Sequence, residues 1–115
     1  MTHIKRIDEM YSKQPTASEV YDIFSDLIKG EFNISVKKDD NNGRPSGFII
    51  FRKLNNKIVE LTYDKKTDNI YNIIMYNDTT NASRRYDETI KDIDSKTSDE
   101  IATEIYNYLL SIPQE

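Results

Sequence analysis

The chain has 115 residues and a net charge of −4, and 37% of its residues are hydrophobic and 31% charged. A chain of this length has the size of one domain and buries roughly two-thirds of the surface that it exposes when unfolded. It contains no cysteine and a single histidine, His3, so disulfides, thiolate metal sites and histidine-based catalytic triads are not expected. We therefore predict one globular domain over residues 1–115, without a cofactor or a metal ion.

Residues 1–14 open the chain with Ile4, Ile7 and Tyr11 at helical spacing before Pro15. This spacing predicts a short N-terminal helix that is loosely attached to the rest of the domain. Charged residues interrupt the segment, so it lacks the apolar run of a signal peptide, and no later segment approaches the ~18 apolar residues of a membrane span. We expect a cytoplasmic protein that does not bind membranes.

Two amphipathic helices are predicted from their capping residues. Thr16 is followed by Glu19 at the spacing of a capping box, and an apolar face continues until Gly30, a residue typical of helix ends. The segment "TSDEIATEIYNYLLSIP" repeats this pattern from Thr97 to Pro113. Both segments are expected to pack an apolar face against a sheet.

Four segments between these helices alternate as strands do, namely "EFNISVKK", "GFIIFRKL", "KIVELTYD" and "NIYNIIMYN". A two-residue turn at Asn55 and Asn56 would pair Leu54 with Lys57. That register fixes which side chains of the hairpin share a face. It places in the core Phe48, Ile50, Leu54, Val59, Leu61 and Tyr63, and we expect Tyr71, Ile73 and Met75 of the last strand to join them. The opposite face then shows Ile49, Phe51, Ile58, Ile70, Ile74 and Tyr76.

Residues 84–93 place Tyr86, Ile90 and Ile93 at helical intervals, and we predict a helix there. Tyr86, Glu88 and Ile90 would also suit an edge strand. The predicted fold class is thus α+β, a four-stranded antiparallel meander with flanking helices in the order α-α-β-β-β-β-α-α.

The segment "DDNNGRPSG", residues 39–47, invites a ligand-binding interpretation because it holds two of the three glycines. Its acids and glycines do not match the spacing of a calcium loop, and it lacks the Gly-Lys-Ser/Thr ending of a phosphate loop. We predict a long hairpin connection, with a recognition loop that presents Arg44 as the alternative.

One functional alternative is a metal-dependent nuclease. It would use Asp64 and Lys66 with Asp39 or Asp40, since two carboxylates can hold magnesium while a lysine supports the attacking water. These residues follow strand ends in polar turns, however, where charged residues are commonest. We expect no catalytic residues and no enzymatic activity.

Another functional alternative is a role directed at nucleic acid. Lysine and arginine pairs occur at 37–38, 52–53, 65–66 and 84–85, which would suit a weak nucleic-acid binder if they met on one surface. Residues 87–104 contain seven acids against two lysines, a net −5, and this acidic segment could instead mimic DNA. Acids at a helix start also complement the helix dipole, which needs no function.

The leading hypothesis is a small non-enzymatic module that binds another protein. It depends on the absence of catalytic residues and on a second apolar sheet face, which could also form a homodimer. The expected contact residues are Ile49, Phe51, Ile58 and Tyr76, if no helix covers them, together with Arg44. Ile, Lys and Asn make up 37 of 115 residues, which suits translation from AT-rich DNA and a low-GC bacterium or its phages as the source. The module could then be an accessory regulator or inhibitor encoded on a phage or mobile element.

Overall fold

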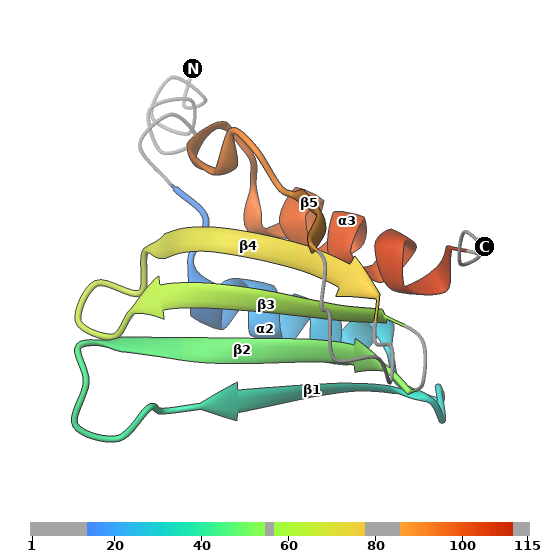
Figure 1. Cartoon of the computed structure of the whole chain (residues 1–115). Coiled ribbons are helices and arrows are strands. Elements are labelled where there is room, and N and C mark those ends of the chain that lie inside the picture. The colour runs from blue at the N-terminus through green and yellow to red at the C-terminus, as the bar shows by residue number, and fades with distance from the viewer. Residues whose placement is uncertain (1–13, 55–56, 78–85, 112–115) are drawn as a thin grey trace, which may run out of the picture.

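The computed structural model describes residues 14–54, 57–77 and 86–111 (Figure 1), and for residues 86–88 only the backbone. In chain order the elements are α2 (Ala17–Leu27), β1 (Ile34–Asp39), β2 (Ser46–Lys53), β3 (Lys57–Asp64), β4 (Ile70–Asn77), β5 (Tyr86–Thr89), a 3₁₀ turn (Ile93–Ser95) and α3 (Ser98–Leu110). Neighbouring strands run antiparallel in the order β1-β2-β3-β4-β5. Both helices lie on one side of the sheet, behind it in Figure 1.

The α+β class and the antiparallel meander of β1 to β4 are confirmed, and the described residues form a single compact domain. The predicted element order is only partly right, because these residues contain two α-helices instead of four. The predicted helix over residues 1–14 falls on positions outside the described ranges. In place of the predicted helix over residues 84–93, Tyr86–Thr89 form β5 and Ile93–Ser95 form the 3₁₀ turn, while residues 84 and 85 lie outside the described ranges.

β5 lies along β4, which would otherwise be the edge of the sheet. Its backbone pairs with β4, and the N–H of Ile90 donates to the carbonyl of Ile73 at 3.1 Å. Ile90 is buried, and Ile93 follows in the 3₁₀ turn. The edge-strand interpretation of this segment is therefore correct. Its apolar residues suit both the spacing of a helix and the alternation of a strand, and pairing with β4 selects the strand.

The β2–β3 hairpin differs from the prediction by one residue. Lys53 pairs with Lys57, so three residues separate the strands where Asn55 and Asn56 alone were expected to. Because successive side chains of a strand point to opposite faces, this shift moves the whole of β2 to the other face. Leu54, predicted to be in the core, is 58% exposed.

The consequence is that Ile49 and Phe51 pack under the helices, whereas Phe48 and Ile50 lie on the helix-free side. The β3 half of the predicted core is confirmed, since Val59, Leu61 and Tyr63 are all buried there.

β4 carries a second register change. Thr62 pairs with Asn72 but Tyr63 pairs with Ile70, so a bulge lies between them. The bulge turns Ile70 into the core and leaves Tyr71 exposed, the reverse of the prediction. Further along β4, the predicted burial of Ile73 and Met75 is confirmed.

The two helices begin side by side, joined by polar groups at their N-termini. Thr16 accepts from the N–H of Glu19 at 3.2 Å, as an N-cap should. The hydroxyl of Ser98 accepts from the N–H of Thr16 at 3.2 Å and donates to the carboxylate of Glu19 at 2.8 Å. In α3, Thr97 and Glu100 form the complete predicted capping box.

Asp68, in the turn between β3 and β4, fastens α2 to the sheet. Its carboxylate accepts from the N–H of Ser18 at 2.9 Å, and its carbonyl accepts from the N–H of Ala17 at 3.0 Å.

Of the helices that the structure describes, none combines the length and the apolar character needed to cross a membrane.

Candidate functional site

None of the helices described covers the side of the sheet opposite α2 and α3, which we call the free face (Figure 1). Strand alternation assigns its side chains. They are Ser35, Lys37 and Asp39 on β1, Ser46, Phe48, Ile50 and Arg52 on β2, Ile58, Glu60, Thr62 and Asp64 on β3, and Asn72, Ile74 and Tyr76 on β4. The free face therefore mixes apolar and charged groups.

One row of cross-strand pairs runs through the middle of the free face. Lys37 pairs with Ile50, Ile50 with Glu60, and Glu60 with Ile74. Ile50 and Ile74 are half-buried, as is Phe48, two residues from Ile50 on the same strand. Covering the apolar area that these side chains still expose would be favourable by about 25 cal/mol per Å².

A second row places Arg52 beside Ile58 and Ile58 beside Tyr76. The hydroxyl of Tyr76 donates to the carboxylate of Glu60, so this central acid is held within the face. Ile58 and Tyr76 are 4% and 1% exposed, although neither belongs to the core under the helices. Ile58 and Tyr76 were predicted to lie on the sheet face opposite the core, and they do. They expose little of their surface there.

The structure does not place Ile49 and Phe51 beside them. Both are 0% exposed, and the ring of Phe51 meets the ring of Phe24 from α2 edge to face at 4.8 Å. The contact prediction for this pair required that no helix cover them, and that condition is not met. Their assignment to the uncovered face is wrong because the β2–β3 hairpin is one residue longer than expected.

The "DDNNGRPSG" segment does connect a hairpin, as predicted. The N–H of Asn41 donates to Asp39 at 2.9 Å, the side-chain amide of Asn41 donates to the carbonyl of Ser46 at 3.1 Å, and Gly43 adopts a φ of 80°. Arg44 is exposed on this ordered loop, and its N–H donates to the carbonyl of Asn41 at 3.0 Å. Contact through Arg44 stays a prediction.

Gly47, at the end of the same segment, has a packing role. A Cβ atom there would lie 2.7 Å from the hydroxyl oxygen of Tyr63, so the bare backbone makes room for that ring. The ammonium of Lys38 lies 5.8 Å from the ring centroid of Tyr63 and 5.5 Å from that of Tyr21. Burial, followed by the charge of Asp40, raises the pKa of Tyr63.

Asp64, the proposed nuclease carboxylate, organises a turn. Its Oδ2 accepts from the N–H of Thr67 at 2.8 Å and from the Thr67 hydroxyl at 2.7 Å, while its Oδ1 accepts from Tyr71 at 3.2 Å. The bonds from Thr67 lead in holding the pKa of Asp64 below its usual value. Lys65 and Lys66 are exposed, and no group of three or more His, Asp or Glu side chains in the described ranges is placed to hold a metal ion.

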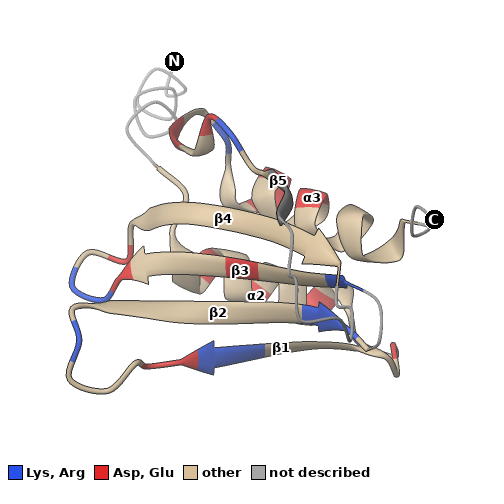
Figure 2. Ribbon diagram, viewed as in Figure 1, with Lys and Arg blue, Asp and Glu red and all other residues tan. Residues whose placement is uncertain are grey.

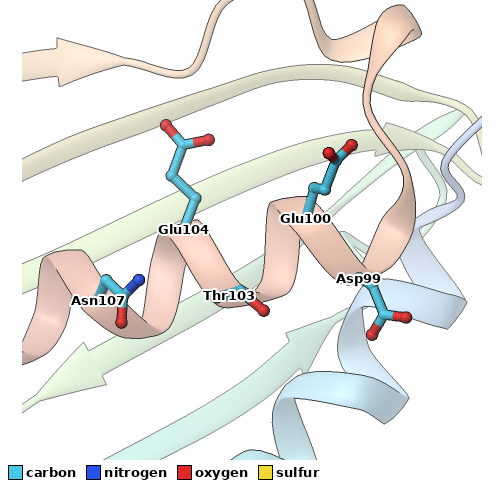
Figure 3. Close-up of a pocket in the computed structure, with 5 residues that line it drawn as sticks. All are labelled: Asp99, Glu100, Thr103, Glu104 and Asn107. Carbon is cyan, nitrogen blue, oxygen red and sulfur yellow. The ribbon is translucent and has the colours of Figure 1, made fainter.

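The acidic segment divides between β5, the 3₁₀ turn and α3. On α3 a shallow hollow of about 390 Å³ is lined by Asp99, Glu100, Thr103, Glu104 and Asn107 (Figure 3). Glu104 accepts from Lys96 at 3.0 Å, and Glu100 accepts from the N–H of Thr97 at 2.8 Å. Two of the three acids on this helix thus serve local structure, and the hollow does not favour DNA mimicry over helix capping.

The cation pairs fall into two groups (Figure 2). Residues 37–38 on β1 and 52–53 on β2 occupy neighbouring strands, and Lys37 and Arg52 both belong to the free face. Residues 65–66 follow β3 at the opposite end of the β2–β3 hairpin, and residues 84–85 lie outside the described ranges. The three pairs within the described ranges do not lie on one basic stripe.

No protein-family model matches the chain, and no curated protein or solved structure matches it either. The function is therefore argued from the residues themselves. Sequence reasoning missed Phe48 and Ile50 as free-face residues, and it gave no sign that Phe32 is 99% exposed. The neighbours of β2 held the missing information, since Glu60 and Thr62 mark the polar side of the adjacent strand.

Proposed function

We propose that this chain is a small non-enzymatic module that binds another protein through the free face and acts as an accessory regulator or inhibitor. One observation supports this proposal above the others. Phe48, Ile50 and Ile74 remain partly exposed in the middle of a sheet face over which the described residues place no helix, with Lys37 and Arg52 beside them. Apolar side chains mixed with charged groups, here with Glu60 between Ile50 and Ile74, are compatible with a non-obligate protein interface, which as a whole is about as apolar as the rest of a protein surface.

The proposal also fits what a solvent-facing antiparallel sheet normally shows. When one face of such a sheet packs on a core and the other meets water, the strands alternate between apolar and polar residues. β3 follows that rule in Glu60 and Thr62, whereas β2 presents Phe48 and Ile50 on the same face. β2 thus carries apolar side chains on both faces, which is expected of a strand that is covered on both sides in its working state.

The amino-acid composition bears on the kind of genome that encodes this chain. The abundance of Ile, Lys and Asn suits a gene of AT-rich DNA, so we propose a phage or mobile element of a low-GC bacterium as its source.

Affinity capture from the source organism tests the proposal, with bound proteins identified by mass spectrometry. Ile50→Asp should abolish capture because it places a charge in the centre of the face. Asn72→Asp is the matched control, since it adds the same charge to an exposed position on the same face and removes no apolar surface.

Several outcomes would reject the proposal. Equal capture by both variants and the unmodified chain would show that the free face is not the contact surface. Retention of DNA alone, lost on raising the salt concentration, would favour the nucleic-acid alternative. A dimer that forms on concentration and is lost in Ile50→Asp would assign the face to a second copy of this chain.

A further inference from the structure

β1 ends the sheet, and its outer edge presents backbone groups that β2 does not use. The N–H of Leu54 donates to the carbonyl of Asn33 at 2.8 Å, which fixes the phase of the β1–β2 hydrogen bonds. In an antiparallel pair the residues that bond to the partner alternate along the strand. The intervening residues, Ile34, Val36 and Lys38, therefore direct their N–H and C=O groups away from β2. In the part of the chain that the structure describes, no strand pairs with this edge.

Positions 37 and 38 of β1 place one lysine on each face of the sheet, and Asp39 ends the strand on the same face as Lys37. Lys37 is exposed on the free face, and Arg52 occupies the diagonal position on β2. Lys38 lies on the other face, where its ammonium is near two tyrosine rings. The nearby acids have local partners, since Asp39 accepts from the N–H of Asn41 and Glu60 accepts from Tyr76. These bonds do not neutralise the carboxylates, so a strand laid along this edge would meet positive charge at Lys37 and Lys38 and negative charge at Asp39, the last residue of β1.

The chain just before β1 supplies an apolar anchor. Phe32 is 99% exposed, and its position is fixed on both sides. The N–H of Glu31 donates to the carbonyl of Ile28 at 2.9 Å, and the carboxylate of Glu31 accepts from Tyr106 at 3.1 Å. On the other side Asn33 is bonded to the β2–β3 hairpin. A large apolar side chain on such a fixed backbone loses little conformational freedom when a partner covers it.

We propose that the β1 edge binds an extended acidic segment of a partner protein, which adds antiparallel as a sixth strand next to β1. Backbone groups at Ile34, Val36 and Lys38 supply the hydrogen bonds, and Lys37 with Lys38 faces the acids of the segment. Because the added strand runs opposite to β1, its acids come first in its sequence and are followed by an apolar residue that packs on Phe32. This inference rests on the proposed protein-binding function and specifies the partner's chemistry.

A second copy of this chain fits the edge less well. The two registers that pair most of β1 with its symmetry mate place the two Lys37 side chains either directly opposite or on diagonal positions. Like charges at such positions destabilise a strand pair. Lysines on an edge strand are a common device against self-pairing, and the same lysines attract an acidic strand.

A nucleic acid also fits less well than an acidic peptide. Its backbone has no repeating N–H and C=O groups to pair with those of the β1 edge, and Glu60 lies between the cations of β1 and the rest of the free face. The geometry thus favours a polypeptide.

Synthetic peptides test the inference directly. The probe is a fluorescein-labelled nonapeptide whose first half alternates Glu with Val and whose second half alternates Thr with Phe. Fluorescence anisotropy at low ionic strength is expected to show saturable binding to the full chain. The same peptide in reversed order should bind about tenfold more weakly, because its phenylalanines no longer reach Phe32. A version with Lys in place of Glu should not bind.

Variants of the chain locate the site. Val36→Pro removes an outward N–H that β2 does not use, so the sheet should persist by circular dichroism while peptide affinity falls at least about tenfold. Lys37→Glu should weaken binding about fivefold, and Lys65→Glu, the matched change in the β3–β4 turn, should leave it unchanged. Phe32→Ser should weaken binding about tenfold, with Leu110→Ser as the matched exposed control.

If Val36→Pro does not fold, N-methylated peptides replace it. Methylation of the amides that face β1 should abolish binding, while methylation of the alternate amides should not. Absent or non-saturable binding of the peptide would overturn the inference, as would equal binding of the Lys peptide. So would a Val36→Pro variant that folds and still binds the peptide. Displacement of the peptide by oligothymidylate, with N-methylation of the peptide having no effect, would also overturn it.

The captured partner separates this inference from the proposed function. A partner that is lost with Ile50→Asp but retained by Val36→Pro would keep the proposed function and overturn the edge inference. A partner that both variants retain would reject the free face itself. Loss with both variants, together with peptide competition for the partner, is the result that we expect.

Discussion

The two faces of β2 differ in burial far more than in hydrophobicity. Ile49 and Phe51 are completely buried under the helices, while Phe48 and Ile50, of the same residue types, are only half-buried on the free face. Their neighbours on β3 explain the choice. The buried pair meets Val59 and Leu61, whereas the other pair meets Glu60 and Thr62. A strand that is apolar on both sides takes its orientation from the strand beside it, and its second face is then left for another partner.

The faces also treat lysine differently. Lys57 lies on the helix-covered face with its side chain 5% exposed, and its ammonium donates to Ser111 and lies 4.5 Å from the ring centroid of Tyr108. Lys37 on the free face is exposed. A cation is therefore accepted on the covered side where an aromatic ring and a helix C-terminus receive it.

The largest expected effect contrasts neighbouring residues of β2. Phe51→Asp removes a buried ring and buries a charge, so it should cost at least about 4 kcal/mol and leave the domain largely unfolded. Ile50→Asp should cost about 1 kcal/mol, because the new carboxylate can reach water. Urea unfolding followed by circular dichroism compares them. Similar stabilities for the two variants would contradict the assignment of the faces.

Much of the fold could be predicted from the sequence because local signals agreed there. The caps at Thr16 and Thr97 and the alternation in β3 each allow one interpretation. β2 reads "FIIF" at its centre, and a run of four apolar residues is compatible with either orientation. Its orientation depended on the length of the hairpin, where Asn55 and Asn56 suggested one residue too few.

The candidate site was predicted less completely for the same reason. An error of one residue in the hairpin exchanged Ile49 and Phe51 for Phe48 and Ile50, although the expectation of a second apolar face was sound. The exposure of Phe32 had no signal in the sequence, because its alternation with Ile34 is typical of a buried strand.

Gly47 tests how tightly the covered face is packed. Gly47→Ala would bring a Cβ to 2.8 Å from Cζ of Tyr63, so we expect a loss of about 1–3 kcal/mol in the free energy of unfolding. Ser46→Ala, one residue earlier, is the control and should change stability by less than about 0.5 kcal/mol. In a double-mutant cycle with Tyr63→Leu, most of the cost should disappear. Additive effects would show that the ring is not the obstacle.

The lysine contrast predicts a smaller effect. Lys57→Ala removes a hydrogen bond to Ser111 and the contact with Tyr108, and should lower the free energy of unfolding by about 1–2 kcal/mol. Lys37→Ala should leave it within about 0.5 kcal/mol. Thermal unfolding of both variants at low and high salt checks this. If both substitutions had the same effect, the two faces would not differ in how they hold a cation.

The smallest expected effect depends on pH and concerns Asp64, at the end of β3. Its hydrogen bonds from Thr67 lower its pKa in the folded chain, so the folded state binds this proton less readily than the unfolded state. The resulting stabilisation is complete above the unfolded pKa of about 3.9 and is lost as the pH falls through the lower folded value. The Tm of the unmodified chain should therefore fall more steeply below about pH 4 than that of Asp64→Asn. Asp99→Asn, in the first turn of α3, is the control for the loss of one negative charge, because it leaves the bonds between Asp64 and Thr67 in place. Parallel profiles for Asp64→Asn and the unmodified chain would mean that the Thr67 bonds do not act on the carboxylate in solution.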